Sequence, residues 1–133
     1  MNRNLYVPRC EPAEEKAREL AKDKLPLAAY KAITTYVKHN IAYDHVKAAK
    51  VAKLSRVLPD PQKCWDTHLG ICQDIASLTT IMLRAADLPA RFVIGWAGKQ
   101  YHAWVETIVG GKTYRFDHSA GLIKPTYKPE RYY

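Results

Sequence analysis

The sequence predicts an α+β fold, with helices in the first two thirds of the chain and an antiparallel sheet in the last third. Up to about residue 88 the apolar residues recur at intervals of three and four, which is the spacing of one helix face. From residue 90 to 122 the chain is instead rich in β-branched and aromatic residues, in runs separated by "AGKQ" and "GG". Since the chain has 133 residues, 47% of them hydrophobic, we expect one domain over residues 1–133, helical in 11–88 and a sheet in 90–122.

Two helices are expected before residue 41. The segment "EPAEEKARELAKDKL" begins with a proline and acidic residues, which are common at helix N-termini. After Pro26, the segment "LAAYKAITTYVKHN" has helical spacing and ends near Asn40, where the chain turns extended. The later stretch "LPDPQK" contains two prolines in three residues and predicts a loop.

A further amphipathic helix is expected after Gly70, closed by Asp87 and Pro89. Its apolar stripe consists of Ile71, Ile75, Leu78, Met82 and Ala85. Cys72 lies in the first turn of this helix. Unpaired backbone N–H groups and the positive end of the helix dipole stabilise a thiolate there. The position therefore favours a nucleophile over a packing residue.

Three strands are expected after Pro89, at "ARFVIGW", "YHAWVETIV" and "KTYRFDHS". Gly110-Gly111 predicts a two-residue hairpin turn between the last two. Counting outward from that turn, the paired residues are Val109 with Lys112, Trp104 with Asp117, and His102 with Ser119. Because side chains alternate between the faces of a sheet, His102 and Asp117 share one face as diagonal neighbours.

The charge of the chain limits the choice of partners. The formal net charge is +8, which favours solubility and attracts anionic surfaces without identifying a partner. Lys47, Lys50, Lys53 and Arg56 recur at three-residue steps and are expected to line a solvated helix face. Because no aromatic residues or known module are interleaved with these charges, no nucleic-acid partner is expected.

No run approaches the roughly 18 to 20 apolar residues that a membrane span needs, so we expect a soluble protein with no membrane partner. We also expect a monomer. The cellular location stays open and includes a secreted or cell-envelope protein processed from a longer precursor. Cys10, Cys64 and Cys72 lack the spacing of metal ligands, so no metal and no other cofactor is expected. In a secreted protein Cys10 and Cys64 could pair and leave Cys72 free.

Cys72 at a helix start, with His102 and Asp117 on adjacent strands, is an arrangement that activates a thiol. In such a triad the imidazole takes the thiol proton, and the carboxylate holds the imidazole in the required tautomer. Either His102 or Asp117 alone has an ordinary interpretation, as a satisfied polar residue or a turn former. The combination predicts catalysis.

Three blocks, "GICQDIASLTTIMLRAADLPARFVIGWAG", "YHAWVE" and "YRFDHS", resemble the transglutaminase-like superfamily in order and spacing. This superfamily is a circularly rearranged relative of the papain-type proteases. The resemblance runs from about residue 33 to 122 and implies a papain-like core, with the nucleophile helix packed against an antiparallel sheet. It implies Cys72 as nucleophile, His102 as base and Asp117 as orienting group. Two positions depart from many members: Ile75 replaces a bulkier aromatic residue, and His118 replaces a proline.

The resemblance fixes the oxyanion donor less well. The backbone N–H of Cys72 is one candidate. Side-chain candidates for contacts with the oxyanion or the substrate are Trp65, Gln73, Tyr43 and Trp104.

The triad predicts acyl transfer from a peptide or protein substrate through a thioester on Cys72. Attack by water would make the protein a cysteine peptidase or amidase, and attack by a lysine amine would make it a cross-linking transglutaminase. The charge, the small size and the lack of the calcium-binding acidic loop found in animal cross-linking enzymes favour hydrolysis. The chain most resembles the short bacterial members of the family, which are often exported. An inactive binding domain is the third alternative, although binding alone would not require all three groups.

Overall fold

The computed structural model describes residues 4–52, 57–118 and 126–133. Within them the chain forms a mixed helix and strand fold with a four-stranded antiparallel sheet, which confirms the predicted fold class. The helices are α1 (Glu11–Ala21), α2 (Pro26–Asn40), α3 (His45–Val51), α4 (Pro61–Thr67) and α5 (Cys72–Ala85). The strands are β1 (Ala42–Tyr43), β2 (Leu69–Gly70), β3 (Ala90–Ala97), β4 (Gln100–Val109), β5 (Lys112–Phe116) and β6 (Tyr127–Tyr132).

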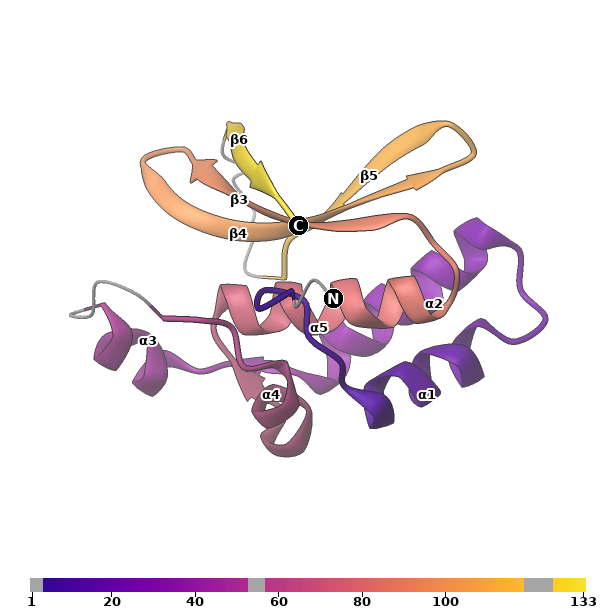
Figure 1. Cartoon of the computed structure of the whole chain (residues 1–133), viewed down its shortest axis with the longest axis horizontal. Coiled ribbons are helices and arrows are strands. Elements are labelled where there is room, and N and C mark those ends of the chain that lie inside the picture. The colour runs from indigo at the N-terminus through magenta and orange to yellow at the C-terminus, as the bar shows by residue number, and fades with distance from the viewer. Residues whose placement is uncertain (1–3, 53–56, 119–125) are drawn as a thin grey trace.

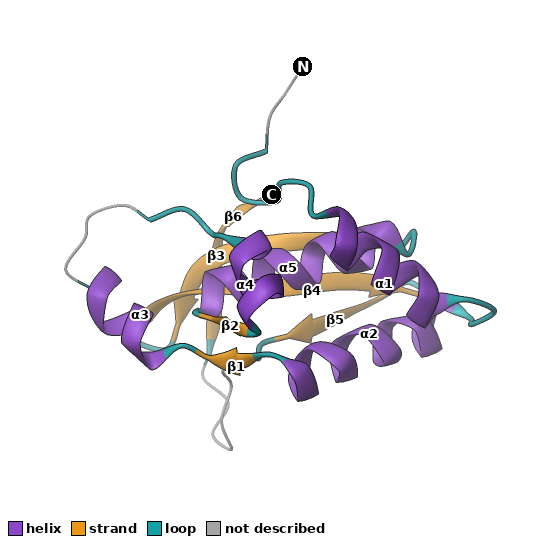
Figure 2. Ribbon diagram, turned by 90° about the horizontal axis from the view of Figure 1, so that it is seen from below, coloured by secondary structure: helices purple, strands orange, loops and turns teal. Residues whose placement is uncertain are grey.

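The sheet lies on one side of the molecule and the helices on the other (Figures 1 and 2). Helix α5 lies between the two layers, since it contacts β3 and β4 on one side and α1, α2 and α4 on the other. The strand order is β5-β4-β3-β6. The predicted meander is therefore present as β3, β4 and β5, while β6 adds a fourth strand beyond the predicted limit of residue 122.

Helix α5 is the centre of the core and is enclosed on all sides. Ten consecutive residues, from Asp74 to Leu83, are buried, so the expectation of a single apolar stripe is wrong. The buried hydroxyls of Thr79 and Thr80 donate to the carbonyl oxygens four residues earlier, at 2.7 and 2.8 Å. Ser77 donates to the carbonyl oxygen of Tyr6 over 2.6 Å. Because each hydroxyl has an acceptor, these polar residues are tolerated inside the core.

The loop predicted at "LPDPQK" is wrong in its second half, because Pro61 is the first residue of α4. The Asp60 side chain accepts a hydrogen bond from the backbone N–H of Lys63 over 3.1 Å and so caps the helix. Proline suits the first helical position, where its missing N–H is not needed. The second proline therefore begins a helix.

Helix α3 carries part of the predicted lysine face. Lys47 does not fit the expectation of a solvated residue, because its Nζ lies 2.7 Å from Oδ2 of Asp74, a side chain only 1% exposed. Lys53 and Arg56, the rest of that predicted face, lie outside the described residues.

The hairpin register is as predicted. Gly110 and Gly111 have φ values of 58° and 77°, in the left-handed region that a two-residue hairpin turn requires and that glycine adopts without strain. Val109 pairs with Lys112, and the ladder continues to Val105 and Phe116. Asp117 follows directly after the last paired residue of β5, and Ser119 lies outside the described residues.

All three cysteines are free thiols, so the pairing considered for Cys10 and Cys64 is not formed. No helix among the described residues is long and apolar enough to cross a bilayer. The described residues also contain no group of three or more His, Cys, Asp or Glu side chains arranged to hold a metal ion.

Candidate active site

Cys72 is the first residue of α5, directly after the short parallel pair of β1 and β2. The pair places Tyr43 opposite Gly70, two residues before Cys72. Asp74 fixes the helix start, since its Oδ2 accepts a hydrogen bond from the backbone N–H of Ile71 over 3.0 Å. As a first-turn residue, Cys72 has a backbone N–H that no carbonyl of the helix can satisfy.

His102 and Asp117 contact each other on the facing sheet. His102 Nε2 lies 2.9 Å from both carboxylate oxygens of Asp117. The two side chains are 11% and 6% exposed, so water screens this contact weakly. Because Nε2 donates to the carboxylate, Nδ1 is the ring nitrogen left for Cys72. The hairpin register thus brings together the histidine and aspartate that the sequence singled out.

The environment of His102 favours its charged form. Burial lowers the pKa of His102, but hydrogen bonds to Asp117 and Cys72, together with their negative charges, outweigh burial and raise the pKa to about 10. At neutral pH the ring is therefore an imidazolium that contacts both a carboxylate and the sulfur of Cys72. Such a cation stabilises a neighbouring thiolate.

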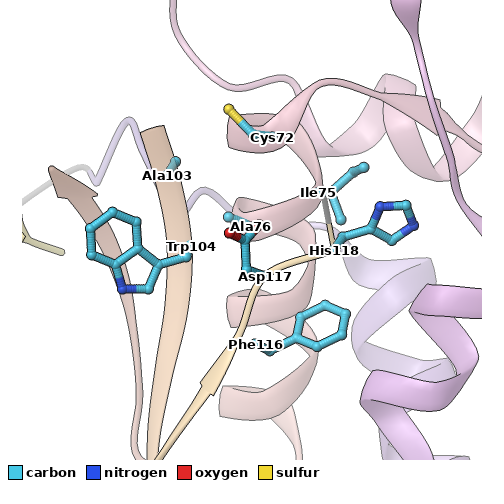
Figure 3. A pocket seen from close by; sticks show the side chains of 8 residues that line it. All are labelled: Cys72, Ile75, Ala76, Ala103, Trp104, Phe116, Asp117 and His118. Carbon is cyan, nitrogen blue, oxygen red and sulfur yellow. The ribbon is translucent and has the colours of Figure 1, made fainter. Parts of the chain in front are cut away.

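A small hollow of about 10 Å³ lies next to Cys72, between α5 and the sheet (Figure 3). Its lining residues are Cys72, Ile75, Ala76, Ala103, Trp104, Phe116, Asp117 and His118. The hollow has room for about one water molecule. Any molecule larger than water must therefore approach Cys72 from outside the hollow.

Tyr127 is a residue that the sequence analysis missed. Its hydroxyl donates to Oδ2 of Asp117 over 2.8 Å. Trp104, a candidate for substrate contact, is fully buried, and its ring centroid lies 4.9 Å from that of Tyr127. Its indole N–H donates to Glu106 over 3.2 Å, so these contacts favour a packing role. No local pattern in "TYKPERYY" signals β6, because its aromatic and polar residues do not alternate and Pro129 interrupts the run.

The three side-chain candidates for the oxyanion donor lie in different surroundings. Trp65 is in α4, where its ring packs 6.2 Å from the ring of Tyr36. The amide of Gln73 donates to the carbonyl oxygen of Val57 over 2.9 Å. Tyr43 lies near the nucleophile: burial raises its pKa, and the negative charge of Cys72 raises the pKa further. Of the three, Tyr43 has the surroundings that best suit the role.

His118 ties the end of β5 to the end of α2. Its Nε2 donates to the carbonyl oxygen of Ile41 over 2.7 Å. Its Nδ1 is buried and has no hydrogen-bond partner among the described residues. The residue thus holds the chain next to Asp117 at the position where many members of the resembled family have proline.

Residues 14–118 match the model of the transglutaminase-like superfamily. The chain belongs to this superfamily. The match begins earlier than the resemblance read from the sequence, because it includes most of α1 and all of α2. An uncharacterized protein of Mycobacterium leprae is 39% identical over 54 residues, an alignment that covers 32% of this chain and 19% of that protein.

Several solved structures have a similar fold. A candidate cysteine protease from Cytophaga hutchinsonii superimposes with a TM-score of 0.69 and 23% identity, over 96% of this chain and 45% of the other. A candidate protease from Parabacteroides distasonis superimposes with a TM-score of 0.67 and 19% identity, over 84% of this chain and 24% of the other. A structure described as a TGase superimposes with a TM-score of 0.63 and 19% identity, over 89% of this chain and 32% of the other. The chain thus spans less than half the length of each relative.

Proposed function

We propose that the protein is a thiol-dependent acyl-transfer enzyme that hydrolyses peptide or isopeptide amide bonds through a thioester on Cys72. The observation that supports this proposal most is the line of contacts from the Cys72 sulfur through the His102 ring to Asp117. Each member of that line has the chemistry that its proposed step needs.

The proposed reaction starts from the ion pair of a Cys72 thiolate and a His102 imidazolium. The thiolate attacks the substrate carbonyl carbon, and the backbone N–H of Cys72 donates to the oxygen that becomes negative. His102 then gives its proton to the leaving amine, the C–N bond breaks, and a thioester remains on Cys72. Asp117 stabilises the imidazolium and keeps Nδ1 directed at the sulfur.

The second half of the proposed reaction returns the enzyme to its starting state. Neutral His102 takes a proton from water, and the resulting hydroxide attacks the thioester carbon. The carboxylic acid product leaves, and the thiolate and imidazolium are restored. Attack by a lysine amine at the same step would give an isopeptide bond, which is the cross-linking alternative.

A peptide p-nitrophenyl ester tests the proposal, because its release of nitrophenol reports acylation directly. Mass spectrometry of the quenched enzyme should find the acyl group on Cys72. We expect Cys72→Ala to abolish acylation without unfolding the protein, because alanine suits a helix. We expect Asp117→Asn to lower the rate by orders of magnitude, because an amide cannot hold the same tautomer.

Adding a primary amine then separates the two acyl acceptors. A hydrolase releases mainly acid even with the amine present, whereas dominant amide product would move the assignment to a transglutaminase. Wild-type protein that no activated ester acylates would instead favour a binding domain.

A further inference from the structure

The hydroxyl of Tyr127 reaches Asp117 across the sheet. The O–H donates to Oδ2 over 2.8 Å, while His102 Nε2 lies 2.9 Å from the same carboxylate. Tyr127 begins β6, which pairs with β3, whereas Asp117 follows β5 at the other edge. In a flat sheet these edges would lie about 14 Å apart, three strand spacings. The sheet is curved rather than flat (Figure 1), and the Tyr127 hydroxyl and the Asp117 carboxylate lie within hydrogen-bond distance.

The ring of Tyr127 is held from two sides. The guanidinium carbon of Arg115 lies 3.8 Å from the ring centroid, and Trp104 packs edge-on with a centroid distance of 4.9 Å. Burial raises the pKa of Tyr127, and the hydrogen bond to Asp117 adds to this, giving a value of about 12. The hydroxyl therefore keeps its proton at neutral pH and remains a donor.

We propose that Tyr127 is a positioning residue for acyl transfer: its hydroxyl fixes the Asp117 carboxylate, and through it the His102 ring, against the Cys72 sulfur. This inference rests on the proposed function. Tyr127 lies outside residues 14–118, the part of the chain that matches the superfamily model, so the match assigns it no role. The Tyr127 hydroxyl and the His102 ring both contact the Asp117 carboxylate, and a carboxylate held from both of these directions is less free to turn than one held by His102 without Tyr127.

The hydroxyl also stabilises the ionised carboxylate, because a hydrogen bond to the charged form favours that form. Among the described residues, the charged or titratable groups that face this cluster include His102 on β4, Arg115 on β5, Cys72 on α5 and His118 after β5. Removing the hydroxyl leaves all of them in place. The carboxylate then takes up a proton at higher pH, and His102 loses its partner there.

The test compares Tyr127→Phe with the wild-type full chain. The first readout is the rate of Cys72 alkylation by iodoacetamide between about pH 3.5 and 9, measured by mass spectrometry of the Cys72 peptide. We expect the rise in alkylation rate on the acid side of this profile, its acidic limb, to move to higher pH by about 0.5 to 1 unit. The second readout is turnover of the peptide ester, for which we expect kcat to fall about 3- to 30-fold with KM within about twofold.

Tyr132→Phe is the matched control. Tyr132 lies on the same strand, also packs against an arginine, with Arg91 at 4.2 Å, and sits at the far end of β6. It should leave both readouts unchanged. In an Asp117→Ala background, Tyr127→Phe should add less than about a twofold loss, because its target is already gone.

A Tyr127→Phe profile that superimposes on the wild-type profile would overturn the inference. A loss that persists in full in the Asp117→Ala background would also overturn it, because the effect would then be structural. If the ester is never turned over but the alkylation limb still moves, the proposed function fails and the positioning role stands.

Discussion

Replacing Asp74 by asparagine should destabilise the protein and disturb the head of the nucleophile helix. Asp74 is buried, and its oxygens accept from Lys47 Nζ at 2.7 Å, from the backbone N–H of Asp60 at 2.8 Å and from that of Ile71 at 3.0 Å. One carboxylate thus ties α3 and the loop before α4 to the first turn of α5. Asparagine keeps the size but replaces one acceptor oxygen by an NH₂ group and leaves Lys47 without its anion.

The magnitude follows from burial. Breaking a buried ion pair by removing one partner costs about 3 to 5 kcal/mol. The Lys47 side chain is 24% exposed, so it can turn toward water and recover part of this cost. We therefore expect a decrease of about 2 to 4 kcal/mol in the free energy of unfolding. For a chain of this size each kcal/mol lowers Tm by about 3 to 5 °C.

Urea unfolding followed by far-UV circular dichroism measures the change, and Asp66→Asn is its control. Asp66 lies exposed on α4 and accepts a hydrogen bond from Gln62 over 3.0 Å, so its loss should cost less than about 0.5 kcal/mol. The double variant Lys47→Met/Asp74→Asn should be less destabilised than the sum of the single variants. A decrease below about 1 kcal/mol for Asp74→Asn, or strict additivity in the double variant, would refute the reasoning.

Three further predictions follow from the site. Limiting iodoacetamide at neutral pH should label Cys72 before Cys10 and Cys64, which are 2% and 1% exposed and whose thiol pKa values burial raises; faster labelling of either would contradict the assignment. NMR should show His102 protonated at pH 8 and titrating near 10. Its contribution to the free energy of unfolding should then be complete below about pH 6.5 and lost as the pH rises through 10. A titration midpoint near 6.5 would refute the ion pair. Gly95→Ala should separate β6 from β3, because the new Cβ would lie 2.8 Å from the Pro129 Cα. The variant should lower turnover at least as much as Tyr127→Phe does. Wild-type turnover in this variant would show that β6 is not needed.

The parts of the site that the sequence could predict depend on local patterns. The helical spacing of the apolar residues in α5 predicted that Cys72 lies at a helix start. The Gly110-Gly111 turn set the hairpin register that brings His102 and Asp117 together. Both signals operate within a few residues or across one hairpin. They need no knowledge of how distant elements pack.

The parts that were missed depend on contacts between distant segments. Lys47 and Asp74 are 27 positions apart, and no local pattern links them. Strand β6 contains Pro129, which normally counts against a strand. It is tolerated here because β6 is an edge strand. Tyr127 therefore depends on a long-range pairing that the sequence does not signal.

His118 shows how a departure from a family pattern can keep the backbone next to Asp117 anchored. A proline after the aspartate would restrict the backbone through its ring. His118 instead anchors the same point by donating from Nε2 to the Ile41 carbonyl oxygen at 2.7 Å. Neutral imidazole in this tautomer and imidazolium both carry a proton on Nε2, so either form can make the bond. The anchor next to Asp117 therefore needs only a proton on Nε2 of His118.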